Sequence, residues 1–486
     1  EELISSAMRI AMISPEVTPF AKTGGLADVA GTLAVALERL GHEVSLVMPA
    51  YRCVLRGDFA LEETPMRFSV PLAERNEEGA VLKAGAGKNI SVYLVRADRY
   101  FDRDSLYGTS AGDYPDNAER FVFFSRAVLE ILRQNPVDIV HCHDWQSALS
   151  IVFLKTQADR YPELTSSRTL FTVHNLGFQG IFGESEWPLL NLDRSFFSPE
   201  YLEFHSHVNF LKGALVFADK ITTVSPTYAR EIMGKEQGFG LEGVLQRRAG
   251  DVVGILNGVD YGQWDPAVDP WIAEPYTKSN LAAKHDCKQS LQRALGLPVR
   301  DEVPLLGIVS RLTAQKGFDL IAKIFGQLMA RDLQIAILGS GEERYEGFFR
   351  RVAKRFPKKV GVRLGFDEAL AHQIEAGADI FLMPSLYEPC GLNQMFSLKY
   401  GTIPVVRAVG GLKDTVENFD PAQGTGTGFV FGPYEPQALM AAIKRALQVY
   451  GDKKAWTALC RRAMSMDFSW ERSADAYSSL YQQLRS

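Results

Sequence analysis

Short apolar runs alternate with helix-like spacings along most of the chain. Residues 8–14 form one apolar run, and a glycine-containing turn follows it. Apolar residues then recur at intervals of three and four between Leu26 and Leu40, which places them on one face of a helix. Gly41 ends this pattern, and a second apolar run covers residues 43–49. The strand–helix–strand order predicts a parallel sheet covered by helices.

Two groups of further apolar runs predict two such sheets. The first group covers residues 137–142, 169–173, 220–224 and 252–256, and the second covers residues 305–309, 335–338, 362–364, 380–383 and 403–406. Because these runs are apolar throughout, we expect strands that are buried on both faces. The predicted fold is therefore α/β, with two Rossmann-like, doubly wound parallel-sheet domains that face a central cleft.

A polar segment separates the two groups. Residues 261–301 are polar, contain four prolines and give little strand signal. We therefore expect an N-terminal domain over residues 1–265 and a C-terminal domain over residues 266–467. Residues 52–117 are less regular, although a strand is expected near Ser91–Val95, and we interpret them as an irregular excursion from the first domain.

Composition and charge exclude several classes of protein. Of the 486 residues, 46% are hydrophobic and 23% are charged, which excludes a disordered, collagen-like or coiled-coil chain. The net charge of −5 offers no basic surface for nucleic acid, and no apolar run is long enough to span a bilayer. The start at Glu1-Glu2 does not resemble a secretory signal. Five scattered cysteines are typical of a reducing, cytosol-like compartment.

Two loops after predicted strands carry positive charge. Residues 22–25 (K-T-G-G) join the first strand to its helix, where two glycines, the helix N-terminus and Lys22 favour an anion. Arg311 and Lys316 follow the strand that opens the second group, and an arginine fork beside a lysine is typical of a diphosphate clamp. The alternative for both loops is a tight turn with solvated charges. Neither is a Walker A or G-x-G-x-x-G loop.

The segment 384–393 (P-S-L-Y-E-P-C-G-L-N) follows the run at 380–383. A helix that begins near Leu392 would offer free N–H groups to a phosphate. Glu388 would repel a phosphate, so it is better suited to hydrogen-bond the hydroxyl groups of a sugar. The alternative is an exposed loop carboxylate.

Histidines end two strands of the first group. His141-Cys142-His143-Asp144 looks like a set of metal ligands, but in a strand His141 and His143 share a face while Cys142 points away. No second ligand pair accompanies them, so we expect no metal. Asp144 at the strand end is a candidate acceptor for a substrate hydroxyl, and His174 shares the same sheet edge.

Taken together, these segments resemble the bacterial glycogen synthases and plant starch synthases that use ADP-glucose. The resemblance covers nearly the whole chain, and any single run is a weak indication. The runs occur in order: K-T-G-G-L-A-D-V at 22–29, H-D-W at 143–145, H-N-x-x-x-Q-G at 174–180, I-T-T-V-S-P-T-Y-A at 221–229, N-G-V-D at 257–260, S-R-L-x-x-Q-K-G at 310–317, E-P-C-G-L at 388–392, K-Y-G-T-x-P-V-V at 399–406 and G-G-L-x-D-T-V at 410–416.

The resemblance implies a GT-B fold in which a C-terminal helix, here within residues 468–486, crosses back onto the first domain. It implies a hexosyltransferase that moves glucose from ADP-glucose to the non-reducing end of an α-1,4-glucan with retention of configuration. The implied partners are ADP-glucose and glycogen, starch or malto-oligosaccharides, with no further cofactor. The expected location is a bacterial cytoplasm, or a plastid stroma in a plant or alga. The residues do not indicate an oligomeric state.

The resemblance also implies roles by position. Arg311 and Lys316 would hold the diphosphate, and Phe366 stands where relatives place an aromatic ring on the adenine. The implied catalytic residues are His174, Arg311, Lys316, Glu388 and Asp144. The implied substrate-binding residues are Glu16, Lys22, Gly24, Gly25, Asn257, Phe366, Cys390, Gly391, Leu392 and Thr415.

The expected mechanism uses neither a covalent nucleophile nor a metal ion. No second carboxylate is evidently placed on the far side of the sugar, so we expect front-face displacement in which the departing phosphate takes the acceptor's proton. One D-x-D pair, Asp102 and Asp104, resembles the metal motif of other transferases. Arg103 partly offsets its charge, and the pair lies away from both cationic loops.

Three alternatives differ from this interpretation. One is a retaining GT-B transferase with another nucleotide sugar or a small acceptor. Another is a catalytically idle glucan-binding protein, which should have lost its charged residues. The third is a nicotinamide oxidoreductase, whose glycine cluster should follow a strand, whereas the cluster at 424–428 precedes one.

Overall fold

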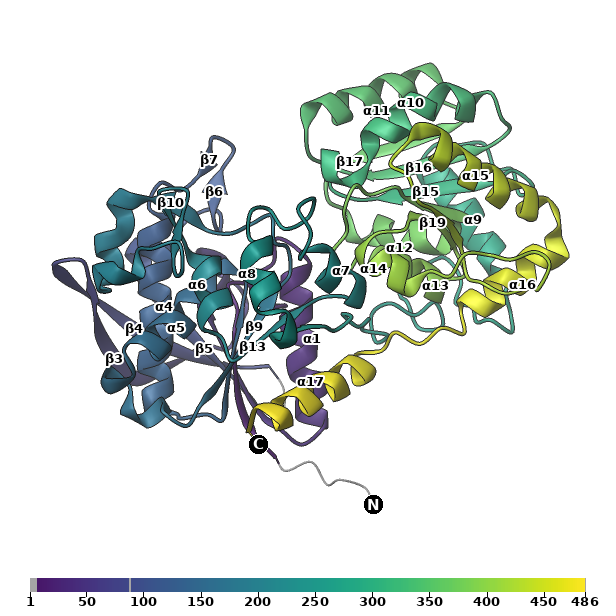
Figure 1. Cartoon of the computed structure of the whole chain (residues 1–486). Coiled ribbons are helices and arrows are strands. Elements are labelled where there is room, and N and C mark those ends of the chain that lie inside the picture. Colours follow the sequence, from purple (N-terminus) through teal and green to yellow (C-terminus); the bar gives the residue numbers. More distant parts are fainter. Residues whose placement is uncertain (1–6, 87–88, 486) are drawn as a thin grey trace. The chain divides into compact units, whose positions relative to one another are not determined.

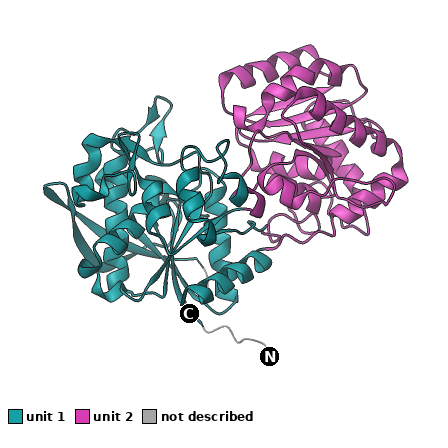
Figure 2. Ribbon diagram, viewed as in Figure 1, with its two compact units in different colours: residues 1–224, 229–258, 470–486 teal, residues 225–228, 259–469 magenta. Residues whose placement is uncertain are grey.

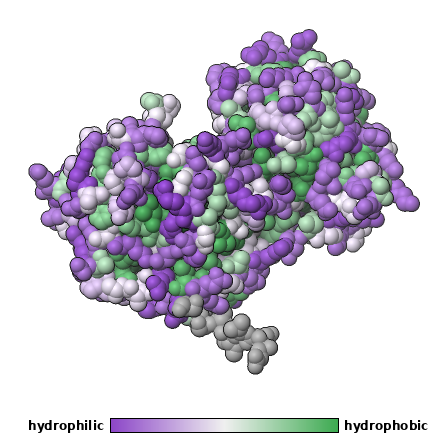
Figure 3. All heavy atoms as spheres, viewed as in Figure 1, coloured by the Kyte–Doolittle hydropathy of each residue, from purple (hydrophilic) through white to green (hydrophobic). Residues whose placement is uncertain are grey.

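The computed structural model describes residues 7–86 and 89–485 (Figure 1). They form two compact units (Figure 2). Unit 1 comprises residues 1–224, 229–258 and 470–486, and unit 2 comprises residues 225–228 and 259–469. Polar side chains cover most of the face drawn in Figure 3, with apolar residues in smaller patches between them.

Unit 1 is built on a nine-stranded sheet in the order β14-β13-β9-β8-β1-β2-β5-β4-β3. The central strand β1 (Arg9–Ile13) pairs in parallel with β2 (Glu43–Pro49) and β8 (Ile139–His143). The other strands are β9 (Arg168–Val173), β13 (Lys220–Thr223), β14 (Val252–Gly254), β5 (Ile90–Arg96), β4 (Arg75–Gly85) and β3 (Glu62–Leu72). As the continuous apolar runs predict, β1 and β8 are almost fully buried.

The expectation of an irregular excursion over residues 52–117 is wrong. Strand β5 continues the parallel part of the sheet beside β2, and β4 and β3 follow as an antiparallel hairpin. One face of β3 is exposed along much of its length, so its sequence lacks the continuous apolar character of the inner strands. The hairpin therefore extends the sheet at its edge.

Helices cover the unit 1 sheet. Helix α1 (Gly25–Arg39) buries an apolar stripe, and α4 (Asn117–Gln134) and α6 (Phe210–Phe217) both pack on α5 (Trp145–Thr156). The C-terminal helix α17 (Trp470–Arg485) packs on α1 within this unit. The smaller elements are α2 (Arg52–Leu55), α3 (Asp98–Phe101), α8 (Glu242–Arg247), the strands β6 (Gly108–Thr109), β7 (Gly112–Asp113), β10 (Ile181–Gly183), β11 (Glu203–Phe204) and β12 (His207–Asn209), and 3₁₀ turns at 158–160, 162–164, 184–190, 194–196 and 249–251.

Unit 2 contains a six-stranded, all-parallel sheet in the order β17-β16-β15-β18-β19-β20. Its strands are β15 (Leu305–Val309), β16 (Gln334–Gly339), β17 (Val360–Leu364), β18 (Ile380–Met383), β19 (Ile403–Arg407) and β20 (Phe429–Phe431). Its helices are α9 (Ala283–Ala294), α10 (Phe318–Met329), α11 (Glu343–Arg355), α12 (Glu368–Gly377), α13 (Asn393–Lys399), α14 (Gly410–Thr415), α15 (Pro436–Gly451) and α16 (Lys453–Ala463). A 3₁₀ turn at 314–316 completes the list. Helix α7 (Pro226–Glu231) is divided between the two units, because residues 225–228 belong to unit 2 and residues 229–258 to unit 1.

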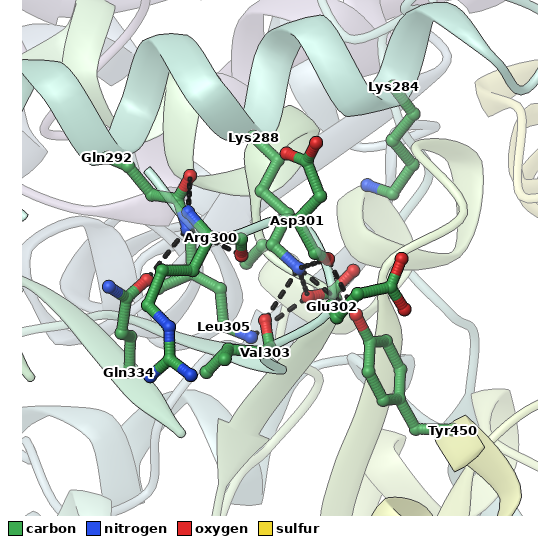
Figure 4. A network of polar contacts seen from close by, with 12 residues as sticks. Lys284, Lys288, Gln292, Arg300, Asp301, Glu302, Val303, Leu305, Gln334 and Tyr450 are labelled. Atoms are coloured by element: carbon green, nitrogen blue, oxygen red, sulfur yellow. Dashed lines mark hydrogen bonds and ion pairs between the residues drawn. The ribbon is translucent and has the colours of Figure 1, made fainter. Parts of the chain in front are cut away.

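One buried charge ties the outer helices of unit 2 to the start of its central strand (Figure 4). The Lys288 ammonium on α9 forms an ion pair with Asp379 at 2.7 Å and donates to the carbonyls of Asp301 and Val303. It also contacts the Tyr450 hydroxyl of α15 at 3.0 Å. Because every donor of the ammonium has a partner, this network is structural.

The expected boundary at 265/266 lies seven residues too late. The units divide at 258/259, and the chain returns to unit 1 at 469/470. The two crossing segments pair, since Val259 bridges to Ser469 and its N–H donates to the Phe468 carbonyl at 2.7 Å. This pairing sets the division, whereas proline content marks only the loop that follows it.

Candidate functional site

The loop after β1 is organised by a buried carboxylate. Glu16 accepts hydrogen bonds from the backbone N–H groups of Thr23 and Gly24 and from the Thr23 hydroxyl, and the Tyr107 hydroxyl donates to it at 2.7 Å. Four donors thus occupy the two carboxylate oxygens. Glu16 therefore holds the backbone of the predicted anion-binding turn in place, and a contact between Glu16 and a sugar stays a prediction.

The turn at residues 22–25 lies at the N-terminus of α1. Gly24 is extended, with φ −157° and ψ −170°, and no side chain caps the helix. A Cβ atom added at Gly24 would meet nothing within 4 Å. Gly25 begins the helix, and the Lys22 ammonium lies 2.9 Å from the Asp28 carboxylate in a half-exposed ion pair. The structure therefore places free helix N–H groups beside one partly neutralised cation.

Asp144 and His174 follow neighbouring parallel strands, β8 and β9, so they meet at one sheet edge. The backbone N–H of His174 donates to Asp144 Oδ1 at 2.8 Å. Asp144 has φ 56° and ψ 178°, a backbone region that is populated almost only by glycine. Such strain costs about 1–3 kcal/mol and is found mostly at functional sites.

Burial shifts the proton affinities of both side chains. The pKa of the Asp144 carboxyl rises to about 7, because the group is desolvated and the Glu16 carboxylate lies nearby, although N–H groups of His174 and Asn175 oppose the shift. Burial lowers the pKa of His174 to about 3. Near neutral pH the site therefore presents a neutral imidazole beside a carboxyl group that gains and loses a proton readily.

Asn257 is the remaining predicted residue of unit 1. It lies in the segment after β14 and is buried, and its Oδ1 atom has no hydrogen-bond partner among the described residues. A buried side-chain acceptor without a partner is unusual in a folded protein. This amide is therefore a candidate for ligand binding.

In unit 2 the predicted cationic and acidic loops line one cavity of about 180 Å³. Lys316 donates to both Glu388 oxygens at 2.9 and 2.7 Å, and the Ser385 hydroxyl donates to the same carboxylate. Arg311 lines the cavity and is exposed, and its guanidinium makes no hydrogen bond or ion pair within residues 7–86 and 89–485. The cavity thus holds one paired cation, one unpaired cation and one carboxylate.

The segment 390–392 is held by close backbone packing. A Cβ atom added at Gly410 would lie 1.8 Å from the Glu388 carbonyl oxygen, so the glycine allows the two loops to touch. Gly391 and Leu392 line the cavity, and Leu392 is the N-terminal cap residue of α13. Cys390 is buried and is not among the lining residues.

Two predicted residues of unit 2 lie apart from this cavity. The Thr415 hydroxyl is buried, donates to the Gly411 carbonyl at 2.6 Å and accepts from Gln394, so its hydrogen bonds are internal. Phe366 is 85% exposed, immediately after β17 and Gly365. Its role as an adenine platform stays a prediction.

The described residues contain no group of three or more histidine, cysteine, aspartate or glutamate side chains placed to hold a metal ion. Asp102 and Asp104 both pair with Arg52, and Arg103 pairs with Asp116. Sequence reasoning missed Tyr107 and the role of His143, whose Nδ1 lies 2.9 Å from His174 Nε2. The only sequence signal for the contact between His143 and His174 was that His141 and His143 share one face of their strand.

The chain is similar to known proteins over nearly its whole length. Residues 9–247 match the family model for the starch synthase catalytic domain, and residues 296–458 match that for glycosyl transferases group 1. A glycogen synthase of Koribacter versatilis is 48% identical and covers 98% of both chains. One of Anaeromyxobacter dehalogenans (strain 2CP-C) is 49% identical and covers 98% of this chain and 100% of its own. The chain belongs to the glycogen and starch synthase family.

Solved structures agree with this membership. The catalytic domain of starch synthase IV from Arabidopsis thaliana, bound to ADP and acarbose, is 34% identical with a TM-score of 0.91, over 99% of this chain and 100% of its own. A sucrose-phosphate synthase from Thermosynechococcus elongatus, 19% identical with a TM-score of 0.60, shares the fold. The predicted GT-B fold and the predicted glycosyltransferase enzyme of glycogen or starch synthase type are confirmed. No helix in the described part of the chain is long and apolar enough to cross a membrane.

Proposed function

We propose that the protein transfers glucose from ADP-glucose to the non-reducing end of an α-1,4-glucan with retention of configuration. The observation that carries this proposal is the cavity of unit 2, where Arg311, Lys316 and Glu388 converge. Two cations suit a diphosphate, and a carboxylate suits the hydroxyl groups of a neutral sugar. A nucleotide sugar combines both chemistries in one molecule.

Lys316 and Arg311 have different parts in donor binding. The Glu388 carboxylate holds the Lys316 ammonium in place. A phosphate oxygen of the bound nucleotide would compete with Glu388 for the N–H groups of this ammonium. Arg311 has no such competitor among the described residues, so its planar fork is available for bidentate contact with a phosphate. As the glycosidic bond to the phosphate breaks, both cations stabilise the growing negative charge.

Asp144 and His174 serve the sugar side of the reaction. A neutral imidazole forms hydrogen bonds with sugar oxygens without placing a second full charge near the reacting carbon. The Asp144 carboxylate accepts a hydrogen bond from a sugar hydroxyl when it is ionised, and the carboxyl group donates a hydrogen bond when it is protonated. Lys22, the Gly24–Gly25 turn and Asn257 complete the proposed contacts, and Glu16 holds the turn.

The proposed mechanism is displacement on one face of the sugar. The acceptor oxygen bonds directly to the anomeric carbon as the bond from that carbon to the diphosphate breaks, so no protein carboxylate is required as a nucleophile. The departing phosphate takes the proton of the acceptor hydroxyl, so no protein base is required either. Lys22, Arg311 and Lys316 supply positive charge that a divalent ion supplies in other transferases. We therefore also propose that transfer needs no metal.

The proposed setting is a bacterial cytoplasm. Glycogen synthases of Anaeromyxobacter dehalogenans and Geobacter sulfurreducens are 49% and 44% identical to this chain, whereas the plant starch synthase structure is 34% identical. None of the five cysteines forms a disulfide, which suits a reducing compartment.

The decisive experiment offers radiolabelled ADP-glucose or UDP-glucose with glycogen or with malto-oligosaccharides. We expect glucan labelling from ADP-glucose, with α-configuration at the new linkage. Preferential use of UDP-glucose would reassign the donor, and labelling of a small sugar alone would reassign the acceptor.

Alanine variants test the proposed roles. Arg311→Ala and Lys316→Ala should each lower kcat strongly with a smaller effect on the KM for glucan, because they act on charge that develops in the transition state. Arg300→Ala is a matched control, since Arg300 forms an exposed pair with Asp332 near the opposite end of β15. A rise in the donor KM at unchanged kcat would mean that the two cations only bind the ground-state diphosphate.

A further inference from the structure

The rings of His141, His143 and His174 form a row of neighbouring imidazoles at the ends of β8 and β9 in unit 1. His141 and His143 share one face of β8, with ring centroids 4.1 Å apart, and the His174 ring lies 5.2 Å from that of His143. His143 Nδ1 lies 2.9 Å from His174 Nε2. The proposed function uses only His174, so two buried imidazoles of this row have no assigned role.

All three rings are neutral near physiological pH. Burial lowers the pKa of His141 and His174 to about 3 and that of His143 well below its usual range. The neighbouring imidazoles further lower the pKa of His141 and of His143. The acidic groups that face the row are Asp144, which His174 contacts through its backbone, and Glu16 beside Asp144. Each neutral imidazole carries one N–H group, so the His143–His174 contact contains a single hydrogen.

That hydrogen has two possible positions. If His174 Nε2 carries it, His143 must carry its own hydrogen on Nε2, which is buried and has no hydrogen-bond partner among the described residues. If His143 Nδ1 carries it, His143 Nε2 is only a bare lone pair. Buried N–H groups without an acceptor are rarer in proteins than acceptors without a donor. The second arrangement is therefore favoured.

We propose that His143 is a positioning residue that donates from Nδ1 to Nε2 of His174 and thereby fixes His174 as the Nδ1–H tautomer. The role of that tautomer rests on the proposed function. It turns the nitrogen of His174 that has no partner in the described part of the chain into a hydrogen-bond donor for a sugar oxygen. A ring free to take either tautomer would present a donor only part of the time.

The rest of the row holds His143 in position. The His141 ring covers that of His143, and both its nitrogens are occupied, Nδ1 by the Tyr481 hydroxyl at 2.8 Å and Nε2 by the Thr172 hydroxyl at 2.6 Å. Tyr481 belongs to α17. The C-terminal helix thus supports the catalytic histidine through two intermediate rings.

Nitrogen-15 NMR of the histidine-labelled 486-residue protein tests the tautomer directly, because protonated and bare ring nitrogens resonate far apart. His174 is identified by the signals lost in His174→Gln. We expect its Nδ1 to be protonated and its Nε2 bare, and His143→Phe to shift the ring toward the other tautomer. A protonated Nε2 in the unmodified protein would overturn the proposal. This readout does not depend on the substrate, so it stands apart from any failure of the proposed function.

Kinetic variants test the consequence. His143→Phe keeps a ring without a donor, and we expect kcat to fall about tenfold with little change in KM, since the His174 ring is free to rotate and change tautomer. His143→Asn places an amide N–H near the position of Nδ1 and should recover most of the loss. His42→Asn is the matched control, because His42 is also buried and contacts α17 through Ser478 but lies outside the row. Equal losses in His143→Asn and His143→Phe, or a similar loss in His42→Asn, would contradict positioning by His143.

Discussion

Replacement of Asp144 by asparagine should change how the stability of unit 1 depends on pH. The Asp144 pKa of about 7 in the folded protein lies above the ordinary value of 3.8, so the folded state favours the protonated acid. The contribution of protonated Asp144 to the unfolding free energy is fully present below about pH 4 and is lost as pH rises through 7. The difference between the two pKa values corresponds to about 4 kcal/mol at most. Partial exposure of the side chain reduces this figure.

Asparagine has the same shape and still accepts the hydrogen bond from the His174 backbone, but it does not ionise. Asp144→Asn should therefore become progressively more stable than the unmodified protein between pH 4.5 and pH 8. Urea titrations at several pH values, followed by hydrogen exchange in peptides from β8 and β9, report on unit 1 separately from unit 2. Asp219→Asn is a control of opposite sign, because Lys155 holds the pKa of Asp219 below its usual value despite burial.

A stability difference that stays constant over this pH range would refute the reasoning, since it would mean that Asp144 ionises as it does in water. Asp144→Gly separates charge from backbone strain. Glycine tolerates φ 56° and ψ 178°, so this variant should gain about 1 kcal/mol beyond asparagine and still lose transfer activity.

Three further outcomes are expected. Glu388→Gln should lower the unfolding free energy of unit 2 by about 2 kcal/mol, because Lys316 loses its charged partner. Calorimetry should show that the variant binds ADP at least as tightly as the unmodified protein, and weaker binding would contradict the competition for Lys316. Gly24→Ala should leave the melting temperature unchanged and raise the KM for the sugar donor. Gly31→Ala should destabilise the protein, because a Cβ atom at residue 31 would lie 2.8 Å from the Thr18 carbonyl oxygen. Equal shifts in melting temperature for the two variants would argue against a ligand at Gly24. Saturating EDTA and Asp102→Asn should each leave transfer within about twofold, or about 0.4 kcal/mol of barrier; activity lost in EDTA and restored by Mn²⁺ would show a metal requirement.

The inner strands were predictable because burial on both faces leaves a direct trace in the residues. The runs at 43–49, 305–309 and 380–383 coincide with β2, β15 and β18. The β3–β4 hairpin was missed because an edge strand with one exposed face has no continuous apolar run. The unit boundary was misplaced because it depends on pairing between segments more than 200 residues apart in sequence, Val259 with Ser469.

The candidate site shows the same distinction. Strand ends predicted that Asp144 and His174 share one sheet edge, since carboxyl ends of adjacent parallel strands lie together. Lys316 and Glu388 were each expected after a strand, but the ion pair between them was not predicted. Sequence does not show which side chains have their hydrogen bonds already filled by neighbours. Glu16 and Thr415 are examples, because their partners come from other loops and helices.

The position of α17 has a consequence for biosynthesis. The helix belongs to unit 1 but is translated after the whole of unit 2. Until α17 has been synthesised, His42 and His141 lack their partners Ser478 and Tyr481, and the Leu256 carbonyl lacks the Ser473 hydroxyl. A nascent chain therefore contains all of unit 2 before unit 1 can complete its packing. A chain that stops before Trp470 would lack the helix that completes unit 1, although the strands of its sheet are present.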